Sequence, residues 1–92
     1  MMKETKTFLQ RCLEGTMRPS EIQDAVDAYH AGDKEGTLRE YLGFDPYEYE
    51  AWGREGDETV TEIVNAHRNG RTLREVRVAQ VMLKGLFSLR GL

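Results

Sequence analysis

The side chains that could do chemistry in this chain are few. Asp27 and His30 stand three residues apart, a spacing found in carboxylate-bridged metal sites when a second such pair faces the first. No second pair is present, because His67 is the only other histidine, and Cys12 is the only cysteine. An internal disulfide framework and a zinc site with several thiolates are therefore excluded. We predict no metal and no cofactor, with both histidines as hydrogen-bonded structural residues and Cys12 as a small core residue.

Catalytic motifs are missing from the sequence as well. No serine or cysteine stands near a histidine and an acid in a recognisable nucleophile motif, and no glycine-rich phosphate loop follows a strand. The glycines of residues 53–58 are separated by charged residues, which is typical of an exposed loop between helices. We predict that the protein is not an enzyme.

Length and composition favour one modest domain. The chain has 92 residues, of which 39% are apolar, and we expect a single helical domain over residues 1–92. The sequence has no apolar run of about 18 residues, the length that a membrane-spanning helix needs. Its first residues lead into a charged helix instead of the apolar region of a signal peptide. We therefore expect a cytoplasmic protein with no membrane contact.

Helix-capping signals recur along the chain and predict an all-α fold, a compact array of about six short helices. In a capping box, two side chains three residues apart each bond the other's backbone N–H. The matching pairs are Ser20 with Gln23, Thr37 with Glu40, Thr59 with Glu62, and Thr72 with Glu75. Asp45 before Pro46 marks a further start. The expected helices cover residues 3–14, 20–31, 37–42, 46–54, 59–69 and 72–90.

Apolar residues follow the helical period in three of these helices and define one buried face for each. The faces are Phe8, Leu9, Cys12 and Leu13 in the first helix, Ile22, Ala25, Val26 and Tyr29 in the second, and Val60, Ile63, Val64 and His67 in the fifth.

The basic, apolar C-terminal helix, residues 72–92, has more apolar surface than one core face needs. One interpretation is a central helix around which the others pack. A second is an interface for self-association, and a third is a basic helix on a membrane surface. The candidate residues for self-association are Val78, Met82, Leu86, Phe87 and Leu89.

Residues 37–52 have the order of a helix-turn-helix, with a short helix, a turn at Gly43 and a second helix capped by Asp45. A recognition helix in the major groove needs positive or neutral donors. The second helix instead carries acids, including Glu48 and Glu50, and offers no Arg, Lys, Asn or Gln before Trp52 to read bases. We expect a helix-turn-helix-like pair that does not itself read DNA.

Three segments of the chain share a combined pattern. An acidic helix, residues 22–30, ends in the pair Tyr29-His30. A Leu-x-Glu-Tyr/Phe-Leu-Gly segment follows at residues 38–43, and a Glu-Tyr-x-x-Trp segment at residues 48–52. In this combination, residues 20–70 resemble short, largely uncharacterised bacterial and phage (mobile-element) helical proteins. The resemblance implies a small helical fold and a genomic setting in phage-like or defence-related regions, and it transfers no activity or site residue.

Charge is divided unevenly along the chain. Residues 1–65 carry seven basic and fifteen acidic residues, a balance of −8, whereas residues 66–92 carry six basic residues and one acid, a balance of +5. Two candidate surfaces follow from this division. A protein partner would bind an acidic aromatic surface made of Asp45, Tyr47, Glu48, Glu50, Asp57 and Glu58. Nucleic acid would contact a strip made of Arg68, Arg71, Arg74 and Arg77, which could equally pair with acids of the chain.

We therefore expect a small binding or regulatory protein of phage or mobile-element type that acts through protein–protein interaction and self-associates as a homo-oligomer. The alternative is a DNA-binding transcriptional regulator or antitoxin-like protein that uses the arginine strip.

Overall fold

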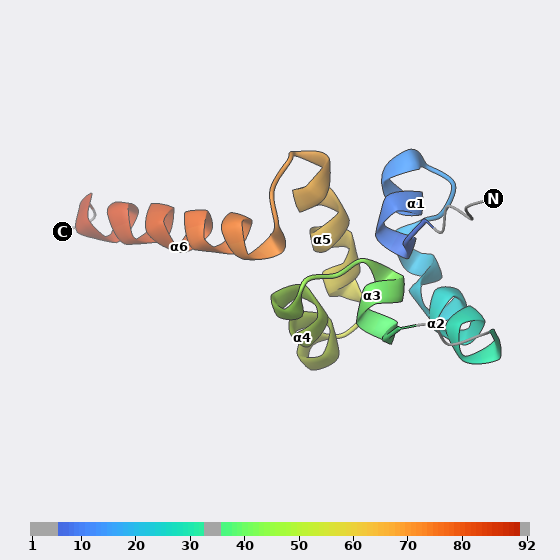
Figure 1. Cartoon of the computed structure of the whole chain (residues 1–92). Coiled ribbons are helices and arrows are strands. Elements are labelled where there is room, and N and C mark those ends of the chain that lie inside the picture. The colour runs from blue at the N-terminus through green and yellow to red at the C-terminus, as the bar shows by residue number, and fades with distance from the viewer. Residues whose placement is uncertain (1–5, 33–35, 91–92) are drawn as a thin grey trace.

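Within the residues that the structure describes, the protein forms a body of five short helices and a sixth helix that projects from it (Figure 1). The computed structural model describes residues 6–32 and 36–90, with side chains described for residues 6–32 and 36–85. The all-α architecture is confirmed. The elements are α1 (Phe8–Glu14), the 3₁₀ turn η1 (Pro19–Glu21), α2 (Ile22–Ala31), α3 (Leu38–Leu42), α4 (Pro46–Glu55), α5 (Glu58–Arg68) and α6 (Leu73–Arg90).

The starts of α3, α4 and α6 follow the capping residues that the sequence predicts. Thr37 accepts a hydrogen bond from the Glu40 N–H, and the Glu40 carboxylate accepts one from the Thr37 N–H at 2.9 Å. Thr72 and Glu75 make the same reciprocal pair at the start of α6. Asp45 caps α4. Each box satisfies N–H groups that have no partner within the helix.

The predicted start at Ser20 is wrong. Ser20 lies inside η1, where the Arg18 N–H donates to the Glu21 carboxylate at 2.6 Å, and α2 begins only at Ile22. Proline at the first position of η1 fixes the backbone one residue before the serine.

Two further helix starts differ from the prediction. Helix α5 begins at Glu58, so Thr59 lies within its first turn, where it is buried, and does not cap the helix. α1 starts at Phe8, later than expected, because Thr7 and Gln10 form a capping box there. Thr7 and Gln10 both fall within the helix expected over residues 3–14, so no helix start was expected at these residues.

Helix α5 forms the centre of the body. It contacts α1, α4, α6 and η1. The predicted apolar faces are largely confirmed, although Leu13 lies at the surface with 39% of its area exposed. The buried apolar cluster contains Phe8, Leu9, Cys12, Ile22, Ala25, Leu42, Phe44, Ala51, Val60, Ile63, Val64 and Leu73.

Helix α6 leaves the body, so the interpretation of a central last helix is wrong. Leu73 is buried and Val76 is half-buried, whereas Val78 and Met82 are exposed. The other helices already pack around α5, so only the first turns of α6 contact α4 and α5. The radius of gyration is 15.8 Å, larger than the value of about 12 Å for a compact chain of this length.

Three of the residues proposed for self-association, Leu86, Phe87 and Leu89, have side chains that lie outside the described residues. In the part of α6 whose side chains are described, Val78 and Met82 are at the surface as that interpretation requires. None of the helices that the structure describes is long and apolar enough to cross a bilayer.

The predicted helix-turn-helix-like pair corresponds to α3 and α4. Gly43 joins them with φ of 82°, in the left-handed conformation expected of the turn. Phe44 and Trp52 pack edge-to-face behind the turn, with ring centroids 6.3 Å apart. α3 has only five residues, however, and its likeness to the DNA-binding motif stays a prediction.

We predict that Gly43→Ala destabilises the protein more than Gly15→Ala does. Both glycines have a positive φ, 82° and 84°, so both variants lose about 1–2 kcal/mol to backbone strain. A Cβ at position 43 would also lie 2.5 Å from Thr7 Oγ1, whereas nothing lies within 4 Å of one at position 15. Displacing Thr7 removes the cap of α1 and adds about 1–2 kcal/mol.

Urea unfolding of the two variants measures the difference in their free energies of unfolding. Equal destabilisation of both variants would contradict the close packing of the α3–α4 turn on Thr7.

Candidate functional site

Glu48, expected on the surface, is fully buried, so its assignment to the acidic aromatic surface is wrong. None of its area is exposed. Its Oε1 accepts a hydrogen bond from the Asp45 N–H at 3.0 Å, within the capping box of α4. Its Oε2 accepts one from the Leu73 N–H at 3.0 Å and lies 2.7 Å from His67 Nε2. This one carboxylate therefore joins α4, α5 and the start of α6.

The unpaired N–H groups at two helix starts explain why a carboxylate is buried here. The first N–H groups of a helix have no partner within it. Glu48 satisfies one such group of α6, at Leu73, and one N–H at the Asp45 cap of its own helix. The partial positive charge at helix N-termini also favours a carboxylate. Together these contacts offset the cost of removing the charge from water.

The pairing of Glu48 with His67 resembles the arrangement in which a carboxylate orients a histidine for acid–base chemistry. A reaction also needs a nucleophile or a substrate cavity beside the histidine. In the described part of the chain no hydroxyl or thiol bonds to His67, and the hollows between α1, α2 and α3 and along α6 are lined by other residues. We therefore assign the pair the structural role of holding three helices together.

The other candidate metal ligands lie on a different helix from Glu48 and His67. Asp27 and His30 are both exposed on α2, and the His30 ring packs against Tyr29 with centroids 5.4 Å apart. Among residues 6–32 and 36–90, no three His, Cys, Asp or Glu side chains are placed to share a metal ion. His67 is a hydrogen-bonded structural residue, as the sequence predicts. Its partner Glu48 lies 19 positions earlier, too far along the chain for a sequence pattern to indicate the pairing.

Cys12 is buried in the core, as predicted. Burial raises the pKa of its thiol to about 11, and the nearby Arg68 opposes this only in part. A thiol with so high a pKa carries almost no thiolate at neutral pH, which makes it a poor nucleophile.

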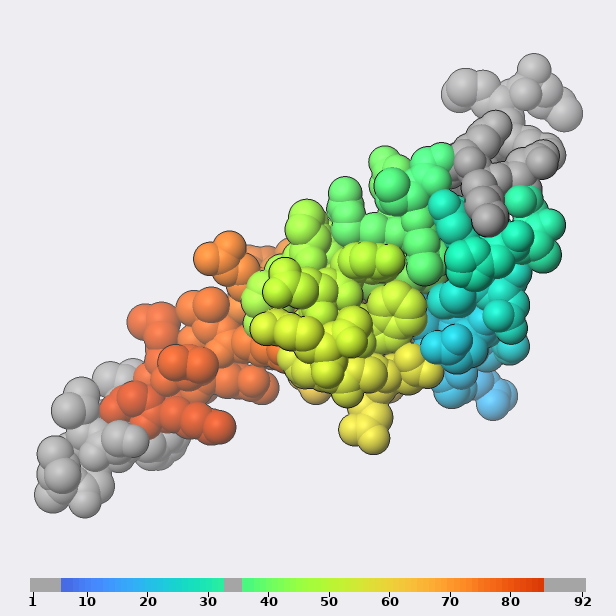
Figure 2. Space-filling model, turned by 90° about the horizontal axis from the view of Figure 1, so that it is seen from below, coloured from blue at the N-terminus to red at the C-terminus, as the bar shows by residue number. Residues whose placement is uncertain are grey.

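The structure brings together only some of the other residues predicted to form the acidic aromatic surface. Asp45 is engaged as the cap of α4. Asp57 accepts hydrogen bonds from Trp52 Nε1 at 2.9 Å and from the Gln23 amide. Glu50 and Glu58 are exposed. Figure 2 shows α4 and the turn after it at the centre of one face of the molecule.

The two tyrosines of this surface have different neighbours. Tyr49 packs against Trp52, with ring centroids 5.8 Å apart. Tyr47 lies toward α6, where its hydroxyl contributes to the high pKa of Arg77. Among the described contacts, those of Tyr49 lead to the acids after α4, because Trp52 beside it donates to Asp57. We define the acid face as Glu50, Asp57 and Glu58, with Tyr49 at its border.

The arginine strip does not form a continuous cationic surface. Arg77 lies 2.7 Å from Glu55 and 3.2 Å from Glu62, and chiefly the Glu55 bonds hold the pKa of its guanidinium above its usual range. Arg68 donates to the Cys12 carbonyl at 3.3 Å. Arg71 and Arg74 are exposed and, within the described residues, form no salt bridge. The alternative of pairing within the chain therefore holds for Arg77.

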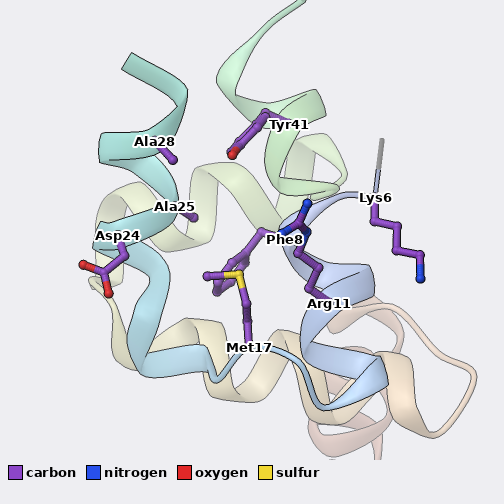
Figure 3. Close-up of a pocket in the computed structure, with 8 residues that line it drawn as sticks. All are labelled: Lys6, Phe8, Arg11, Met17, Asp24, Ala25, Ala28 and Tyr41. Carbon is purple, nitrogen blue, oxygen red and sulfur yellow. The ribbon is translucent and has the colours of Figure 1, made fainter. Parts of the chain in front are cut away.

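A small pocket lies between α1, α2 and α3 (Figure 3). Its volume of about 100 Å³ accommodates one side chain, well below the roughly 300–1,000 Å³ of typical ligand sites. Lys6 at its rim is paired with Glu14 at 2.8 Å. The pocket is lined by Lys6, Phe8, Arg11, Met17, Asp24, Ala25, Ala28 and Tyr41. This cavity is too small for a cofactor or a typical substrate.

Comparison with known proteins gives no family model, no curated protein and no solved structure that matches this chain.

We predict that Glu48→Gln lowers the free energy of unfolding by about 1–3 kcal/mol. The variant side chain has nearly the same shape, but its amide NH₂ cannot accept a hydrogen bond, so one buried donor around it loses its partner. Glu50→Gln, on the exposed side of the same helix, is the matched control and should change stability by less than about 0.5 kcal/mol.

Thermal and urea unfolding of the two variants measure this difference. Amide hydrogen exchange at Leu73 should also be faster in Glu48→Gln, because α6 loses its attachment at that N–H. If Glu48→Gln were as stable as Glu50→Gln, the buried carboxylate would have no part in joining the helices.

Proposed function

We propose that this protein is a non-enzymatic binding module that acts through protein–protein contact, with the acid face as the surface that receives a basic partner. The observation that carries the proposal is the exposure of Glu50 and Glu58. Within the residues that the structure describes, Glu50 has one salt-bridge partner, Arg54, at 4.0 Å and itself largely exposed. No salt bridge to Glu58 occurs among the described residues. These carboxylates remain available to a partner.

Two properties of the surroundings support this choice of surface. The part of the chain that contains it, residues 1–65, has a balance of −8, which attracts basic proteins over several ångströms and speeds their encounter. The half-buried Tyr49 and Trp52 beside the acids offer rigid aromatic area of the kind enriched at protein interfaces. The resemblance of residues 20–70 to phage-like proteins implies a phage-like or defence-related genomic setting for this binding module.

A double charge reversal, Glu50→Lys with Glu58→Lys, should abolish partner binding. Asp57 is left unchanged because it holds Trp52 and Gln23. The matched control reverses two exposed acids of α2, Asp24 and Asp27, and so changes the net charge equally. The tagged full chain is incubated with nuclease-treated bacterial lysate, and retained proteins are identified by mass spectrometry.

Basic proteins should be retained by the native chain and by the control, lost from the Glu50/Glu58 variant, and released by added salt. Circular dichroism verifies that each variant is folded. Retention of the same proteins by the Glu50/Glu58 variant would refute the acid face as the binding surface.

The exposure of Arg71 and Arg74 supports a second candidate function, DNA binding by a regulator or antitoxin-like protein. If it holds, duplex DNA binds the full chain with an affinity that falls steeply with salt. Arg71→Ala with Arg74→Ala should then weaken binding and reduce the salt dependence. Arg77 is unsuitable for this test because its loss would break the bridges to Glu55 and Glu62. Absence of duplex binding at low salt would eliminate this function.

A further inference from the structure

We draw no further inference here: the strongest candidate, the exposed apolar surface of the outer part of α6 at Val78, Val81, Met82 and Leu83, carries none because nothing in the described part of the chain shows what covers it.

Discussion

A buried carboxylate must find hydrogen-bond donors, and in this chain that requirement fixes three helices at once. Glu48 takes its donors from its own cap, from His67 on α5 and from the first N–H of α6. The direction in which α6 leaves the body is therefore set by one side chain at its origin, supported by the Glu55–Arg77 bridge about one turn along. The core around α5 supplies the apolar contacts, but the carboxylate decides how the last three helices meet.

The parts of the fold that depend on neighbouring residues were predictable from the sequence. Thr37 with Glu40 and Thr72 with Glu75 form boxes because each pair needs only one turn of helix to meet. The apolar period likewise located Ile22, Ala25, Ile63 and Val64 in the core. The errors at Ser20 and Thr59 have a local cause too, since an earlier residue starts the turn in each case.

The candidate site was less predictable because its contacts join distant parts of the chain. Glu48 read as a surface acid on a charged helix, and its partners lie 19 and 25 positions further on. Arg77 read as one member of an even strip, yet its carboxylates come from α4 and α5. Apolar periodicity also could not distinguish a central last helix from a projecting one, because α6 carries large apolar residues, such as Val81 and Met82, that are exposed.

The outer part of α6 is free of the constraint that packing places on the body. Past its first turns the helix adds nothing to that packing, so substitutions of its exposed residues are not selected against for loss of stability. The core residues of the body have no such freedom, since they pack together around α5. In a lineage carrying this fold, substitutions are therefore expected to accumulate along the exposed part of a single helix, while the five-helix body and its buried carboxylate remain unchanged.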